Sequence, residues 1–301
     1  MGDLVEFLSL LGLELKTEKS LIATSDVFLG LAAFSPRPSN GMSLAISLPR
    51  GKAHKRAQLI TGIISSGTMS HATPESLIGR LSFAQTAGFG RFARAMLKPL
   101  YAKLFPPRYY PQLPIPLTRN LLWWATTLLS MTPRIATLAR TSPDWVIYDD
   151  ASFNDSQKEA HLAAIFLSTQ GPYEIQAPLV LTGQPTAGDI AFFKTTSVIF
   201  GLELSAAVLA ISQARHRLQG KAVTIYMDNN AALAAIVNGD SASIAAFRLI
   251  ATLWYLVAAH DISLWLERVD TAKNIADLPT RNRPFPFPTL AKSPPHPFRM
   301  H

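Results

Sequence analysis

Four acidic residues in the second half of the chain occupy positions that a stable fold alone does not favour. Asp150 closes a run of strand-forming residues that begins at Trp145, and Asp228 follows a second such run. Asp277 comes two residues before a proline that would end its short helix. Glu203 is the only charged residue of a long apolar stretch. An ionised carboxylate left unpaired there costs several kcal/mol, so Glu203 must be neutral, paired or metal-bound.

Carboxylates at strand ends and on helices that cross a sheet can converge on one point. Open α/β sheets bind ligands at the carboxyl ends of their strands. Four carboxylates within a few ångströms repel one another and persist only around cations. Ligation by oxygen alone selects hard divalent ions, Mg²⁺ first and Mn²⁺ next. Two such ions about 4 Å apart promote in-line attack of water on a phosphodiester. The acids therefore predict a nuclease that uses two Mg²⁺ ions, with Mn²⁺ as the substitute.

Each acid taken alone also has a simpler explanation. Asp150 is of a type common in turns after strands, and Asp228 is well placed to cap the helix that follows it. Asp277 would be ordinary as a surface acid. Glu203 is hardest to explain in this way, because its neighbours on both sides are apolar. The presence of all four in this order of elements favours the metal site.

The hydrophobic pattern of the second half predicts an α/β fold. Three strands with short connections indicate an antiparallel meander, and later strands that alternate with helices favour parallel additions to the same sheet. We expect a mixed five-stranded sheet with helices on both faces. The expected strands span residues 145–150, 161–168, 173–182, 222–227 and 261–267, and the expected helices span residues 195–217, 229–237, 243–259 and 271–278.

The first half is expected to be mainly helical, with one β-hairpin. A short strand at residues 27–33 and a second at 43–48 would form the hairpin. The expected helices span residues 3–16, 52–64 and 117–129, with a further helix start at residue 73. Prolines interrupt residues 106–116 and 133–143, so we place a domain boundary between residues 143 and 144. Residues 284–301 are proline-rich and are expected to form a flexible tail.

The charges are divided unevenly between the two halves. Residues 1–143 contain 16 Lys and Arg against 6 Asp and Glu, whereas residues 144–301 contain 12 against 14. This uneven charge suggests that the first half binds along a polyanion and that the second half acts on the same polyanion. The alternative is a solvated basic surface without a partner.

The composition of the chain excludes some kinds of site and argues against a membrane partner. The chain has no cysteine, which excludes disulfides and thiolate zinc sites. The longest apolar runs carry a charge and fall short of a membrane span, so we expect no membrane partner. We expect an intracellular protein, cytoplasmic or nuclear.

Residues 144–283 resemble the ribonuclease H domains attached to retroelement reverse transcriptases. The matching motifs are Tyr148–Ser152, Leu202–Ala206, Tyr226–Leu233 and Trp265–Arg281. The last two are most similar to DIRS- and Ngaro-type retroelements. The resemblance implies a ribonuclease H-like fold and cleavage of the RNA strand of RNA–DNA hybrids with two Mg²⁺ ions. It implies catalytic and metal-binding roles for Asp150, Glu203, Asp228 and Asp277.

The first half is similar to the palm end, thumb and connection of a reverse transcriptase. The similar segments are Phe28–Leu31, Ser47–Lys52, Leu77–Ala84 and Trp123–Trp124. Basic residues in the first turns of a helix contact phosphates without reading sequence. We therefore predict contacts with an RNA–DNA hybrid or other duplex, and plain solvated helix faces are the alternative. The predicted contact residues are Lys52, Lys55, Arg56, Arg80, Arg91 and Arg94, with Asn229 and Asn230 in the second half.

The sequence departs from these families in two places, and both departures limit the activities that we predict. Polymerases of this type need a Tyr-x-Asp-Asp turn after fingers and palm regions. Tyr148 is followed directly by two aspartates, and Asn229 replaces the second aspartate after Tyr226. We expect no polymerase activity from this chain by itself, with the palm and fingers missing or on a separate chain. The loop before Asp277 also lacks the histidine that aids product release in many ribonucleases H. Lys273 stands in that loop beside Asn274.

Two other functions stay open at this point. One is an inert retroelement remnant that only binds nucleic acid, and the other is a different nuclease or an integrase of the same fold. Asp149 is expected to point to the opposite face of the sheet from Asp150, because strand side chains alternate.

Overall fold

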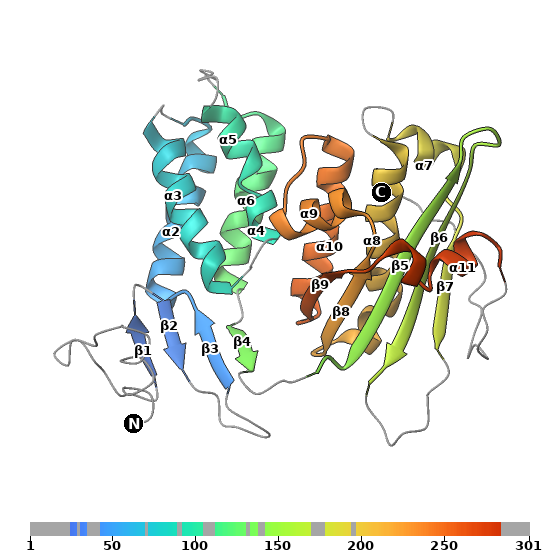
Figure 1. Cartoon of the computed structure of the whole chain (residues 1–301). Helices are drawn as coiled ribbons and strands as arrows, with labels where there is room; N and C mark the ends of the chain where they lie inside the picture. The colour runs from blue at the N-terminus through green and yellow to red at the C-terminus, as the bar shows by residue number, and fades with distance from the viewer. Residues whose placement is uncertain are drawn as a thin grey trace, which may run out of the picture.

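Two β-sheets, each accompanied by its own helices, make up the described part of the chain (Figure 1). The computed structural model describes residues 25–28, 31–34, 43–69, 72–88, 92–104, 112–130, 133–137, 142–169, 178–193 and 197–283. The expected helix at residues 3–16 and the expected tail at 284–301 lie outside these ranges.

The second sheet has five strands in the order β7-β6-β5-β8-β9. Strands β5 (Trp145–Asn154), β6 (Glu159–Ser168) and β7 (Leu179–Gly183) form an antiparallel meander. Strand β8 (Ala222–Met227) then runs parallel to β5, and β9 (Ser263–Arg268) runs parallel to β8. The prediction of a mixed five-stranded sheet is confirmed. The second half has a ribonuclease H-like fold.

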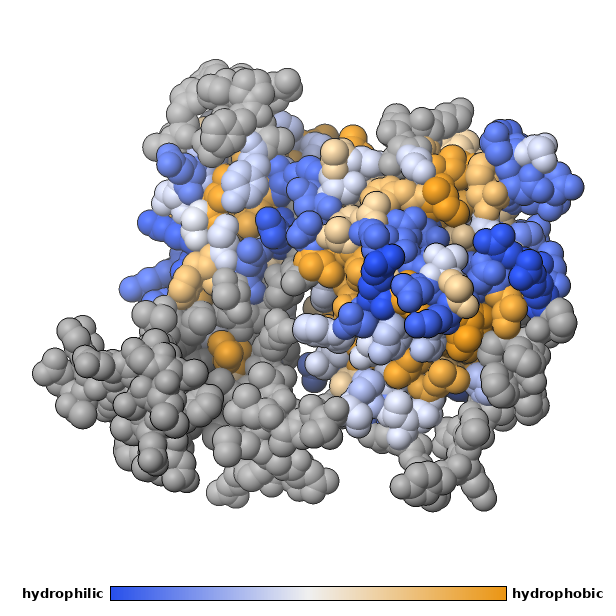
Figure 2. Space-filling view, in the orientation of Figure 1, coloured by the Kyte–Doolittle hydropathy of each residue, from blue (hydrophilic) through white to orange (hydrophobic). Residues whose placement is uncertain are grey.

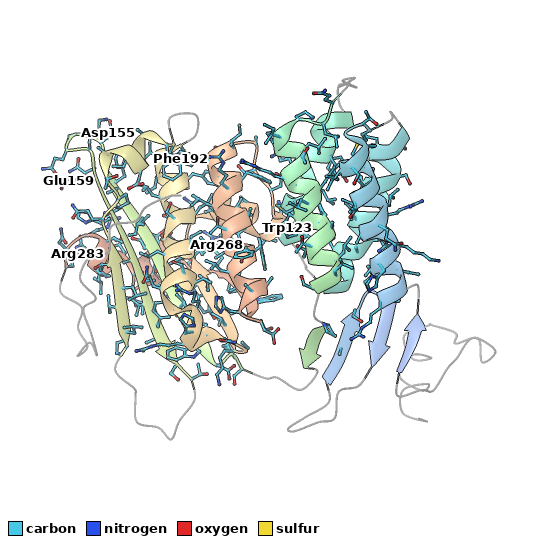
Figure 3. All side chains as sticks on the ribbon, turned by 180° about the vertical axis from the view of Figure 1, so that it is seen from behind. Trp123, Asp155, Glu159, Phe192, Arg268 and Arg283 are labelled. Atoms are coloured by element: carbon cyan, nitrogen blue, oxygen red, sulfur yellow. The ribbon has the colours of Figure 1, made fainter. Side chains whose placement is uncertain are left out.

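Helices cover both faces of this sheet, as predicted. On one face, α8 (Val198–Leu218) crosses β5 and β6, and α10 (Ile244–Ala259) packs on α8. Figure 3 views the molecule from this side. Helix α9 (Asn230–Asn238) packs against β8 and β9. On the other face, the short α11 (Asp277–Thr280) lies against β5 and β6 (Figure 1). A short helix, α7 (Ala187–Ala191), was not predicted.

Helix α8 is the centre of the main hydrophobic core. It is apolar nearly all round, which is typical of a buried helix. By length and composition this helix could cross a membrane, so the expectation that its apolar run is too short is wrong. Its most apolar window, however, is 67% buried inside the protein. The core around α8 contains residues of β5, β6 and β8, including Ile147, Phe166 and Ile225.

The chain between η2 (Thr271–Lys273) and α11 replaces the single helix expected at residues 271–278. Asn274 ends the 3₁₀ turn with extended backbone angles, and its side chain bonds elsewhere. Polar side chains of this type favour local alternatives to a continuous helix. The break places Asp277 in the first turn of the separate helix α11.

The first sheet corrects two predictions. Its strands β1 (Ser25–Phe28), β2 (Leu31–Phe34), β3 (Ser43–Ser47) and β4 (Arg134–Thr137) are antiparallel in this order. The single strand expected at residues 27–33 is wrong, because Phe28 belongs to β1 and pairs with Leu31 of the antiparallel strand β2. The expected hairpin is part of a four-stranded sheet, since β4 pairs with β3 across about a third of the chain.

In the described residues, five helices follow or flank this sheet. They are α2 (Arg50–Ser66), α3 (Ala72–Gly88), α4 (Phe92–Ala95), α5 (Lys98–Leu104) and α6 (Ile115–Ser130). The helices predicted at 52–64 and 117–129 are confirmed and extend further at both ends. Helix α6 packs against α2 around the fully buried Trp124, whose ring nitrogen donates to the Met96 carbonyl at 3.0 Å.

The buried hydrophobic residues of the two halves form separate clusters. The halves meet where α4 packs against α10. Here Lys98 pairs with Asp240 at 2.8 Å and lies over the ring of Phe247, with 4.8 Å between nitrogen and ring centroid. The separate clusters support the domain boundary between residues 143 and 144, which stays a prediction.

Candidate metal centre

Asp150, Glu203 and Asp228 converge at the carboxyl ends of β5 and β8. Each offers a carboxylate oxygen, and these three atoms lie within 4.8 Å of one another. The strand register explains the convergence of the aspartates, because β5 and β8 are parallel neighbours in which Tyr148 pairs with Tyr226. Two residues beyond this pair, Asp150 and Asp228 follow on the same side of the sheet. Glu203 joins them from α8.

Burial and mutual repulsion disfavour charge on these acids. Burial first, and then the charges of Asp149, Asp150 and Asp228, raise the pKa of Glu203 to about 10, against the opposing effect of a backbone hydrogen bond from Ala151. Burial raises the pKa of Asp150 to about 6, although the Thr280 hydroxyl and Arg281 oppose this change. Glu203 therefore holds a proton at neutral pH when no cation is bound. The cluster can carry its full negative charge only around a cation.

The residues present fit a hard divalent cation. Glu203 Oε2 is buried and has no hydrogen-bond partner among the described residues. A buried oxygen without a partner is unfavourable unless a ligand or an ion meets it. The three residues offer only carboxylate oxygens, which suit Mg²⁺ and Mn²⁺.

Asp277 lies next to this cluster but is not one of its three converging acids. Its charge contributes to the raised pKa of Asp150, so the two carboxylates are neighbours. Its Oδ1 accepts a hydrogen bond from Arg281 Nε at 2.5 Å, one turn further along the chain. The structure thus brings three of the four predicted acids together and pairs the fourth with a cationic side chain.

Asp149 is a fifth carboxylic acid at this site. Asp149 lies on the same face of β5 as Ile147 and Ala151, which belong to the core on the α8 side. Asp149 is fully buried, and both carboxyl oxygens lack a hydrogen-bond partner among the described residues. Burial first, and then Asp150 and Asp228, hold its pKa well above the usual range. The predicted direction of its side chain fits this burial, but its complete burial was not foreseen.

The simpler explanation of Asp228 as a helix cap is wrong. The N-cap of α9 is Asn229, whose side-chain oxygen accepts hydrogen bonds from the backbone of Ala231 and Ala232, each at 3.1 Å. The predicted nucleic-acid contact of Asn229 would therefore use its amide NH₂ group. Asn230 is exposed at the start of α9, and its predicted contact is not tested.

Three hydrogen bonds join strand β5 to the segment that carries Asp277. Asn274 Nδ2 donates to the Asp149 carbonyl at 2.9 Å. The Thr280 hydroxyl donates to Asp150 Oδ2 at 2.5 Å, and the Ser152 hydroxyl donates to the Thr280 carbonyl at 2.8 Å. Sequence patterns gave no sign of these contacts, because each partner lies more than a hundred residues away.

In the loop that lacks the histidine, the two residues that could take its role differ in their exposure to solvent. Asn274 is buried and holds the backbone of β5, so its side chain is not available to a substrate. Lys273 is exposed and lies 3.5 Å from Asp270 in an ion pair. Figure 2 shows hydrophilic residues gathered over the segment that joins β9 to α11.

The predicted basic contacts of the first half lie on α2, α3 and α4. Lys52 and Arg56 lie over the ring of Phe83, at 5.9 and 5.5 Å from its centroid. Arg56 is half-buried, and burial followed by the charge of Arg80 lowers its pKa. The exposed members are Lys52, Lys55, Arg80 and Arg94, whereas Arg91 lies outside the described residues. Their role in binding stays a prediction.

Comparisons with known proteins find similarity only among solved structures. No family model and no curated protein matches the sequence. Solved structures do match. Ribonuclease H1 from Halobacterium salinarum NRC-1 is 16% identical, with a TM-score of 0.34, over 44% of this chain and 89% of that chain. The N-terminal ribonuclease H domain of a Mycobacterium tuberculosis protein is 14% identical, with a TM-score of 0.35, over 47% and 93%.

A third similarity extends into the first half. A foamy viral protease–reverse transcriptase, solved in complex with double-stranded DNA, is 17% identical with a TM-score of 0.32. The match covers 84% of this chain and 46% of the viral chain. The fold itself is assigned from the order and directions of the five strands.

Proposed function

We propose that the chain is a metal-dependent endonuclease that hydrolyses the RNA strand of RNA–DNA hybrids. The convergence of Asp150, Glu203 and Asp228 within 4.8 Å is the observation that carries this proposal. An all-carboxylate site at the carboxyl ends of parallel strands suits phosphodiester hydrolysis. The four sequence motifs around the acids support a retroelement ribonuclease H, DIRS- or Ngaro-like, within a reverse transcriptase.

The proposed cofactor is Mg²⁺, with Mn²⁺ as the substitute. When bound, a divalent ion supplies positive charge beside the phosphodiester and lowers the pKa of a water molecule. Asp150, Glu203 and Asp228 would hold the ion. Glu203 would lose its proton as the ion binds, because its pKa is raised in the metal-free protein. Asp277 would join the site by exchanging its ion pair with Arg281.

We propose that residues 1–143 form a region like the end of a polymerase and hold the duplex. The basic residues of α2, α3 and α4 would contact phosphates without reading sequence. The excess of basic residues in this half supports the proposal. Residues 144–283 would form the nuclease, and polymerase activity would need palm and fingers regions from elsewhere.

The pair between Asp277 and Arg281 favours a second candidate, an inert remnant that binds nucleic acid without cutting it. Asp277 is a weaker ligand for a metal ion while its charge is partly neutralised by Arg281. In that case the site would depend on the three remaining acids. Both candidate functions predict binding of nucleic acid, and only the endonuclease predicts cleavage of the RNA strand.

Cleavage of a hybrid with labelled RNA tests the proposal. We expect Mg²⁺-dependent cutting of the RNA strand, with no cutting in EDTA or by the Asp228→Asn variant. Duplex DNA and duplex RNA of the same sequence should stay intact, which separates this activity from that of other nucleases of the fold. Wild-type protein that retards the hybrid on a gel but leaves it whole would support the inert remnant instead.

A further inference from the structure

Thr280 touches the metal centre without offering a ligand to it. Its side chain is 1% exposed, and its hydroxyl donates to Asp150 Oδ2 at 2.5 Å. Thr280 also lies on α11, three residues after Asp277. One residue therefore links the acid of strand β5 with the element that carries the fourth acid.

The hydroxyl has three acceptors within reach but a single proton to give. The Asp277 carbonyl lies 3.2 Å from it and the Ala276 carbonyl lies 3.3 Å from it, as in many helices. The Asp150 carboxylate is nearer, and a hydrogen bond to a charged acceptor is roughly twice as strong as one to a neutral acceptor. The proton therefore goes to Asp150, which holds Oδ2 in one direction.

The backbone of Thr280 is held as well. The Ser152 hydroxyl donates to the Thr280 carbonyl at 2.8 Å. Two residues of β5, Asp150 and Ser152, therefore form hydrogen bonds with Thr280. Helix α11 has only four residues and contains a proline. Helices of this length are not stable by themselves, so contacts with β5 and β6 must set the position of α11.

We propose that Thr280 is a positioning residue of the metal centre. Its hydroxyl orients the Asp150 carboxylate toward Glu203 and Asp228, and its backbone, gripped by Ser152, sets the distance between α11 and β5. The inference rests on the proposed function in one respect, that Asp150 binds the metal ion. Residues that orient a ligand in this way typically change metal affinity by about 10- to 100-fold when mutated.

Metal binding by the full chain, measured by calorimetry with Mg²⁺ and Mn²⁺, tests this role without relying on cleavage. Thr280→Val removes the hydroxyl and keeps the shape, whereas Thr280→Ser keeps the hydroxyl. Thr252→Val is the matched control, because Thr252 donates to the Arg248 carbonyl within α10, away from the acids. If the Thr280→Val variant does not fold, Thr280→Ala, which places no methyl group against Asp150, takes its place.

We expect Thr280→Val to weaken Mg²⁺ binding by about tenfold or more, and Thr280→Ser to restore it to within about threefold of wild type. Thr252→Val should bind as wild type does. The proposal is overturned if Thr280→Val binds Mg²⁺ as tightly as wild type. It is also overturned if Thr280→Ser binds Mg²⁺ as weakly as Thr280→Val, because packing and not the hydroxyl would then determine the affinity.

The cleavage assay keeps the two proposals apart. Wild type that cuts the hybrid while Thr280→Val binds Mg²⁺ normally would overturn this inference alone. Wild type that leaves the hybrid intact, but whose Mg²⁺ binding depends on the Thr280 hydroxyl, would overturn the proposed function alone. Wild type that binds neither ion would overturn both.

Discussion

After burial, Asp149 is the largest cause of the raised pKa of Glu203, ahead of the two aspartates that converge with it. Asp149 lies on the α8 face of β5, and both acids are buried where α8 crosses this strand. The two groups cannot both be charged in a buried space without a cation. A residue outside the proposed ligand set therefore contributes to the protonation of the ligand that α8 supplies.

Replacing each of the adjacent aspartates by asparagine should give opposite results. Asp149→Asn resembles the protonated acid that the raised pKa of Asp149 favours, so this variant should keep hybrid cleavage and bind Mg²⁺ about as tightly as wild type. Asp150→Asn removes a proposed ligand and should lose both. Calorimetry and cleavage at pH 7 check the pair. A folded Asp149→Asn variant without cleavage would contradict the assignment.

The metal-free protein should become less stable as pH rises. The folded pKa of Glu203 is about 10 and its ordinary value is 4.5, so between these values the folded state keeps a proton that the unfolded state releases. Its stabilising contribution is complete below pH 4.5 and is lost as pH rises toward 10, by at most about 1.4 kcal/mol per pH unit for one proton. Urea unfolding in EDTA at pH 5, 7 and 9 measures this slope. Glu203→Gln should make the unfolding free energy depend less on pH. Equal slopes for this variant and wild type would contradict the raised pKa of Glu203.

Binding of Mg²⁺ at pH 7 should release close to one proton. Glu203 is protonated at this pH in the metal-free protein, whereas Asp150, with a pKa of about 6, is mostly ionised. The ion must displace the Glu203 proton to bind its oxygen. Calorimetry in two buffers with different ionisation enthalpies counts the protons released. Titration at pH 5 is the control, where Asp150 should add to the number released.

Two glycines should respond in opposite ways to alanine. A Cβ at Gly201 on α8 would lie 2.2 Å from Cδ1 of Phe193, so Gly201→Ala should destabilise the protein by about 1–3 kcal/mol through overpacking. Gly62 on α2 has nothing within 4 Å of an added Cβ, and Gly62→Ala should stabilise by about 0.5–1 kcal/mol. Urea midpoints of the two variants check both signs. A stable Gly201→Ala variant would mean that Phe193 moves aside without loss.

The basic face of α2 should account for part of the salt dependence of duplex binding. Replacing Lys52 and Lys55 by alanine should weaken hybrid binding whatever its sequence and should lower the salt slope by about one per lost phosphate contact. Lys158→Ala, at an exposed turn of the second half, is the control. Affinity measured across a salt series checks this. An unchanged slope would mean that these two side chains lie in solvent.

The sequence alone determined the elements and motifs of the second half. A run of strand-forming residues marked β8 at its observed bounds, and the lone charge of Glu203 within an apolar helix indicated a buried acid with a special role. These signals are local, because a strand or helix repeats its pattern within a few residues. Asp150 and Asp228 could be placed together since parallel neighbours end at the same edge of a sheet.

Only the tertiary structure decided the details that join distant segments. Thr280 reaches Asp150 across 130 residues, and nothing near either residue in the sequence announces that contact. Strand β4 is too short to stand out and forms only because β3 offers it an edge. Asp277 and Arg281 are four residues apart, so their pairing is local, but the charges of Asp150 and Asp228 act on Arg281 only because the fold brings them near. Side-chain hydrogen bonds and charges depend on distance in space, which sequence spacing does not set.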